Sequence, residues 1–174
     1  MPKKPFFYFD ELKLSDKIAI GIYLVLTLVL LYSYNFLSPQ TTQFILIMYI
    51  VVPQLSIYIF LYVSLRNFKV YLIWMFFSFV NILMYFIFRK NPDLVMYRGN
   101  PSSGLINTIV LLLLFQLLRY FSLQIQHREF VAPAKGGGKD LIENRELTLA
   151  DYSILIIYMG SWFGLFYFSL NFIS

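Results

Sequence analysis

The chain has 174 residues, of which 59% are hydrophobic, 20% aromatic and only 13% charged, with a formal net charge of +5. A soluble domain usually carries about 25% charged residues, so this composition excludes an ordinary soluble fold. Cysteine is absent, which excludes disulfides, thiolate metal sites and cysteine nucleophiles. The positive charge predicts a defined orientation in a membrane and contact with membrane lipids; we expect no nucleic-acid partner.

Five apolar stretches are each about 20 residues long, the length that crosses roughly 30 Å of hydrocarbon. They cover residues 18–37, 44–65, 70–88, 105–125 and 152–173. We therefore predict an all-α integral membrane protein, a single transmembrane domain formed by a bundle of about five transmembrane helices. A bacterial or archaeal cytoplasmic membrane, or an organellar inner membrane, is the expected location.

Lysine and arginine residues are divided unevenly between the loops. With the N-terminus inside, eleven of the fourteen fall on the inner side and three in the outer loop, residues 89–104. Loops on the cytoplasmic side are enriched in lysine and arginine. This pattern predicts a cytoplasmic N-terminus, a cytoplasmic loop at residues 126–151 and a C-terminus on the opposite side.

The second span contains a proline near its middle. Pro53 removes one backbone donor, and we predict a structural kink there rather than a gating hinge. Gln54 follows it and is expected to bind a carbonyl that the kink frees.

Polar side chains follow one face of the third span and one face of the fourth. The first set is Trp74, Ser78, Asn81 and Tyr85; the second is Thr108, Gln116, Arg119, Ser122 and Gln126. Such stripes on membrane helices face protein or a wet cavity. We expect Asn81 and Ser78 to hold the bundle together, with a ligand contact as the alternative.

Arg119 is the only charged residue within the five spans, roughly 9 Å from the inner end of its helix. One interpretation is snorkelling, in which the long side chain lifts the guanidinium to the headgroups. The other is a charge paired with protein or with lipid phosphate. Gln116 and Arg98 are further candidates for contact with lipid or a partner.

The inner loop has three features of interest. Gly136, Gly137 and Gly138 predict a flexible hinge, and the surrounding residues lack the phosphate-loop pattern. Residues 141–147 could form a short amphipathic helix. His127 and Glu129 are expected to be solvated charges.

Beyond the loop, Thr148 and Asp151 stand three residues apart, as a helix N-cap and its N3 carboxylate do.

The final span carries its small and polar residues on a single face. These residues are Ser153, Gly160, Gly164, Tyr167 and Asn171. Gly160 and Gly164 form a G-x-x-x-G pattern, which lets two helices approach closely. We therefore predict a packing or partner interface here, either with another span of this chain or with another subunit.

No catalytic, cofactor or metal site is expected, because the spans contain no acid, histidine or lysine. The favoured function is a non-catalytic structural or accessory subunit of a larger multi-subunit membrane complex, with other transmembrane subunits as partners. The alternative is a small transporter or lipid-handling protein whose cavity is lined by spans three and four. An enzyme using His127, Glu129 or Asp93 is the least favoured.

Overall fold

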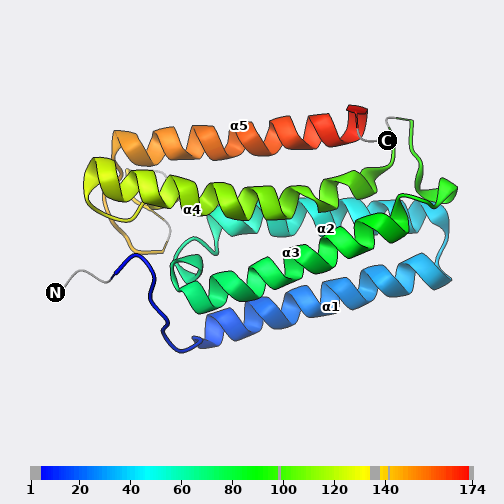
Figure 1. The fold of residues 1–174 in the computed structure, drawn as a ribbon, viewed down its shortest axis with the longest axis horizontal. Coiled ribbons are helices and arrows are strands. Elements are labelled where there is room, and N and C mark those ends of the chain that lie inside the picture. The colour runs from blue at the N-terminus through cyan, green and yellow to red at the C-terminus, as the bar shows by residue number, and fades with distance from the viewer. Residues whose placement is uncertain (1–4, 98, 134–137, 141, 173–174) are drawn as a thin grey trace.

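The computed structural model describes residues 5–97, 99–133, 138–140 and 142–172. Five long helices follow one another: α1 (Leu14–Phe36), α2 (Pro39–Ile59), α3 (Phe68–Phe88), α4 (Asn107–Gln126) and α5 (Leu149–Phe172). Each is long and apolar enough to cross a membrane. The chain passes up and down, so that consecutive helices run in opposite directions (Figure 1). The predicted all-helical fold with five candidate spans is therefore confirmed for the described residues.

Local capping explains where several helices begin. The Ser38 hydroxyl accepts a hydrogen bond from the amide of Thr41, and Pro39 occupies the first helical position, where a missing N–H costs nothing. Because of this signal α2 begins at Pro39, five residues earlier than predicted. Asn67 caps α3 in the same way, its Oδ1 accepting from the amide of Lys69 at 3.1 Å.

The second helix ends at Ile59, whereas the predicted span ran to Leu65. A turn and the short 3₁₀ segment η1 (Ser64–Arg66) follow it. Leu61, Tyr62 and Leu65 are buried inside the bundle. The apolar run continues past the helix because these residues are covered by protein, and hydropathy does not distinguish protein from lipid.

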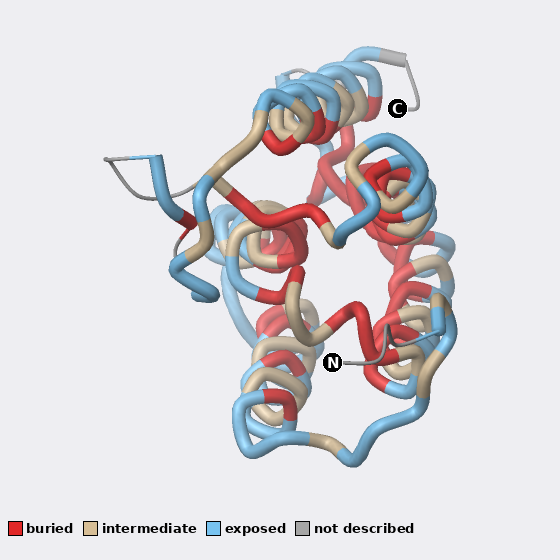
Figure 2. The backbone as a smooth tube through the Cα atoms, turned by 90° about the vertical axis from the view of Figure 1, so that its left-hand side faces the viewer, coloured by how far each residue is buried: buried red, intermediate tan, exposed pale blue. Residues whose placement is uncertain are grey.

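The helices pack around one core, with α1 and α5 at opposite edges of the bundle (Figure 1). Seen along the helix axes, buried residues line the inward faces and exposed residues the outside (Figure 2). Leu30, Leu46, Ile57 and Leu111 are fully buried. In a membrane the surrounding lipid is as apolar as these side chains, so close packing and hydrogen bonds between helices must supply the stability.

Two connections shape the ends of the bundle. At one end, η2 (Pro92–Leu94) and η3 (Pro101–Leu105) join α3 to α4. At the other, which we call the loop end, residues 127–148 connect α4 to α5.

The predicted amphipathic helix at 141–147 is wrong for the described residues 142–147, which contain no helix. The Asp140 carboxylate accepts hydrogen bonds from the amides of Ile142, Glu143 and Arg145, which would otherwise be available for helical hydrogen bonds. Asn144 has a φ of 54°, which is incompatible with a right-handed helix. Leu141 and the glycines Gly136 and Gly137 lie outside the described residues.

Candidate functional site

Asn81 of α3 lies at the centre of a polar cluster inside the bundle. Its Oδ1 accepts hydrogen bonds from the hydroxyls of Tyr23 and Tyr49, at 3.0 and 2.9 Å. Its Nδ2 donates to the hydroxyl of Thr108 at 3.3 Å. One amide thus links α1, α2, α3 and α4. The stripe of α3 is turned inward, where Ser78 is also fully buried.

Gln54 makes a second cross-helix connection. Its Nε2 donates to the carbonyl of Gly104 at 2.8 Å, and its Oε1 accepts from the indole of Trp162 at 3.2 Å. The carbonyl that Gln54 satisfies therefore belongs to η3, and the expectation that it serves the kink at Pro53 is wrong. Gly104 is suited to this contact because a Cβ there would lie 3.0 Å from Ile50.

Arg119 is fully buried and paired. Its Nη2 lies 2.7 Å from Oε1 of Glu129, its Nε bonds both carboxylate oxygens, and its guanidinium lies 4.5 Å from the ring centre of Phe6. The snorkelling interpretation is therefore wrong. Glu129 was expected to be solvated, but the chain reverses at His127, whose φ is 54°, and returns the carboxylate to α4. Gln116 accepts weakly from Arg119 at 3.4 Å.

Two more arginines hold carboxylates at the loop end. Arg66 pairs with Glu143 at 2.6 Å and also donates to the carbonyl of Phe130. Arg145 pairs with Asp151 at 2.8 Å. With Arg119, these arginines fasten the connecting loop to the helices. Three ion pairs and their hydrogen bonds thus stabilise this end of the bundle, and of their members only Glu129 was expected to be solvated.

Asp140 organises the loop between these pairs. Its Oδ2 accepts from the hydroxyl of Tyr62 at 2.6 Å, and its two oxygens accept from the amides of Ile142, Glu143 and Arg145. Burial alone would raise the pKa of Asp140, but these hydrogen bonds stabilise the carboxylate and lower its pKa below the usual value. Burial, and then the neighbouring carboxylate, raise the pKa of the Tyr62 phenol.

The predicted cap of the final helix is confirmed. The amide of Thr148 donates to Oδ2 of Asp151 at 2.9 Å, and the amide of Asp151 donates to the Thr148 hydroxyl at 3.3 Å. Asp151 is fully buried, and it also accepts from the amide of Val131. The same carboxylate therefore starts α5 and holds the connecting loop.

The small and polar face of α5 points away from the rest of the chain. We call it the α5 outer face, and it consists of Ser153, Gly160, Gly164, Tyr167 and Asn171, all exposed. A Cβ added at Gly160 or Gly164 would meet nothing within 4 Å. The opposite face holds α5 to the bundle, where Tyr158 donates to the Gln54 carbonyl and Ser169 to Asn107.

The remaining predicted residue, Arg98, lies outside the described residues. Sequence reasoning missed Tyr23 and Tyr49, whose hydroxyls must find partners when buried. A count of tyrosines within the spans could have signalled them. It also missed Glu129 as the partner of Arg119, which requires a chain reversal that helix periodicity does not encode.

No protein-family model, curated protein or solved structure matches this chain. The geometry defines a helical protein with five candidate membrane spans, whose buried polar side chains mostly bond other side chains or the backbone of the same chain. Four cavities lie along the seam between α1 and α2 and at the loop end.

Proposed function

We propose that this protein is a non-catalytic structural or accessory subunit of a larger multi-subunit membrane complex, and that the α5 outer face contacts a transmembrane helix of a partner. The observation that carries the proposal is the position of Gly160 and Gly164. Both glycines are exposed on the outside of the bundle, and a Cβ added to either would meet nothing within 4 Å.

Glycine in the interior of a helix is about 1 kcal/mol less favourable than alanine. A helix that met only lipid would gain nothing in return for two such residues four positions apart. Close approach of a second helix would provide the compensation, because it allows backbone contact that larger side chains prevent. Ser153 and Asn171 on the same face can donate or accept hydrogen bonds across such an interface.

The alternative, a transporter or lipid-handling protein with a cavity between spans three and four, has weaker support. Asn81 and Arg119, its proposed contacts, already bond other residues of the chain. Hydrogen bonds within the bundle occupy the polar atoms that a substrate would need. The accessory role requires no such atoms.

We further propose that the loop end is cytoplasmic and that the protein resides in a bacterial or archaeal cytoplasmic membrane or an organellar inner membrane. The unequal distribution of lysine and arginine supports this orientation. The chain has no cysteine, so single introduced cysteines can be labelled without background. Labelling of Lys139→Cys from outside would contradict the orientation.

The accessory role is tested by enlarging the two glycines. The double variant Gly160→Leu and Gly164→Leu should abolish copurification of a stoichiometric partner from mild detergent. It should leave the melting temperature of the isolated chain unchanged, because open space surrounds both positions. Gly21→Leu on α1 is the matched control, since a Cβ there also meets nothing within 4 Å. A wild-type chain that purifies as a monomer without a partner would refute the proposal.

A further inference from the structure

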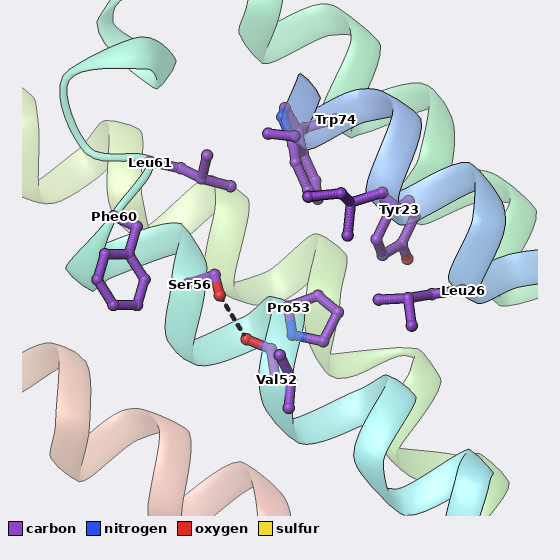
Figure 3. A pocket seen from close by; sticks show the side chains of 10 residues that line it. Tyr23, Leu26, Val52, Pro53, Ser56, Phe60, Leu61 and Trp74 are labelled. Atoms are coloured by element: carbon purple, nitrogen blue, oxygen red, sulfur yellow. Dashed lines mark hydrogen bonds between the residues drawn. The ribbon is translucent and has the colours of Figure 1, made fainter. Parts of the chain in front are cut away.

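A groove follows the seam between α1 and α2. Its central cavity has a volume of about 180 Å³. Tyr23 and Trp74 form a buried floor, whereas Ile22 and Val52 on the rim are 57% and 49% exposed. Figure 3 shows Tyr23, Val52 and Trp74 around the cavity, with Pro53 in its wall. The exposed rim opens the groove toward the outside of the bundle, where hydrocarbon would lie.

Neighbouring cavities extend this groove in both directions. Toward the loop end, a cavity of about 460 Å³ shares residues with the central one and reaches Lys13; the shared residues are Ala19, Ile22, Phe60 and Leu61. Toward the opposite end of the bundle, a cavity of about 200 Å³ shares Leu26 and Val52 with the central cavity and reaches Phe44. From Lys13 to Leu26 the helix rises about 20 Å, more than half of the roughly 30 Å hydrocarbon thickness.

The middle of the groove suits an alkyl chain. Ser56 contributes a hydroxyl to its lining, but that hydroxyl already donates to the carbonyl of Val52 at 2.8 Å. An apolar cavity of about 150 Å³ holds a benzene-sized group, so the central cavity admits a hydrocarbon chain. A helix, about 10 Å across with its side chains, is too wide.

The groove becomes polar at the loop end. A cavity of about 210 Å³ continues it through Lys13, Val63 and Ser64, and is also lined by Asp10, Asp16, Arg66 and Glu143. Arg66 and Glu143 are paired with each other. Lys13 and Asp16, joined by a hydrogen bond at the start of α1, are two further charged residues of this lining.

Asp16 is the unusual member of this set. It is 3% exposed, and its Oδ2 accepts from the amide of Lys13 at 2.9 Å. Its Oδ1 is buried and has no hydrogen-bond partner among the described residues. A buried carboxylate oxygen without a donor is costly, and a ligand that carries an N–H donor would remove that cost.

We propose that the groove binds one bilayer phospholipid whose headgroup carries a primary ammonium. The acyl chain lies along the seam beside Ala19 and Leu26, the ammonium meets Asp16, and the phosphate meets Lys13. The buried Asp16 carboxylate disfavours a headgroup that is only anionic. The proposal goes beyond the accessory role and does not depend on it.

The test measures lipid retention by native mass spectrometry. The protein is reconstituted in phosphatidylcholine nanodiscs containing phosphatidylethanolamine or phosphatidylglycerol, then released into mild detergent. The wild type should retain one phosphatidylethanolamine. Ala19→Trp, which fills the groove, should retain about tenfold less, and Leu28→Trp on the exposed surface of α1 should match the wild type. Asp16→Asn keeps the acceptor for Lys13 but should lower phosphatidylethanolamine retention about tenfold.

Each of these measurements can overturn one part of the proposal. Equal retention of the three lipids by the wild type would overturn the headgroup assignment, and unchanged retention by Ala19→Trp would overturn the groove as the site. A wild-type dimer without lipid would replace the lipid with a second copy of the chain. Should Asp16→Asn fail to fold, the wild-type lipid comparison and the tryptophan pair still test the proposal.

Discussion

The ion pair between Arg119 and Glu129 gives the sharpest test of the structure, because its two members differ in exposure. The Arg119 side chain is 0% exposed and that of Glu129 is 26% exposed. Removing the carboxylate leaves a buried cation without a counter-charge. Removing the cation leaves a carboxylate that water can reach. The two single substitutions should therefore have unequal costs.

Glu129→Leu should lower the free energy of unfolding by about 3–5 kcal/mol, the usual cost of stranding a buried charge. Arg119→Met keeps a long apolar side chain against Phe6 and should cost about 1.5–3 kcal/mol, the range for a lost hydrogen bond to a charged group. The double variant should be more stable than Glu129→Leu alone, since it strands no charge.

Unfolding in mixed micelles with increasing sodium dodecyl sulfate, followed by the fluorescence of Trp74 and Trp162, would rank the three variants. Arg119→Met costing as much as Glu129→Leu would refute the reasoning. That outcome would mean that the guanidinium reaches water or headgroups and that its burial beside Glu129 and Phe6 is not maintained.

Two further predictions concern the bundle core and the connecting loop. Asn81→Leu should lower the free energy of unfolding by about 1–2 kcal/mol in the same assay, as expected for a hydrogen-bonded amide between membrane helices. Asn35→Leu is an exposed control whose amide bonds its own helix, and it should cost little. Equal costs for the two variants would contradict the role of Asn81. Asp140 should make the protection of the loop from proteolysis depend on pH, because the pKa of its carboxyl is lowered in the folded state. Protection should be complete above the unfolded pKa of about 3.9, and it should be lost as the pH falls through the lower folded pKa. Asp140→Asn should remove that dependence, and an unchanged pH profile would count against it.

The number and order of the helices followed from hydropathy alone, and the boundaries failed where a second signal acted. The Ser38 cap moved the start of α2, and burial of Leu61 and Leu65 by protein extended the apolar run beyond its end. A hydropathy scale based on transfer free energies treats the protein interior and the lipid as equally apolar. The stretch after Ile59 therefore carried no sign that it would leave the helix.

The polar stripes were predicted to face protein or a wet cavity, and those of α3 and α4 face protein. The stripe of α5 has the same periodicity but lies outside, because Tyr158 and Trp162 on the other face find partners on Gln54. Periodicity identifies a face but not its neighbour. The pairing of Arg119 was likewise hidden, since it depends on the reversal at His127 and not on spacing along a helix.

The long-range contacts of Arg66 and Gln54 also determine when the bundle can be completed during synthesis. Arg66 lies 77 residues before Glu143, and Gln54 lies 104 residues before Tyr158. At about 5–20 residues per second, their partners emerge from the ribosome several seconds after them. The first four helices are therefore synthesised before the partners of these polar groups, and the arrival of α5 with its loop is the step that closes the bundle. Truncation before residue 143 would leave that intermediate open, a natural substrate for quality-control proteases.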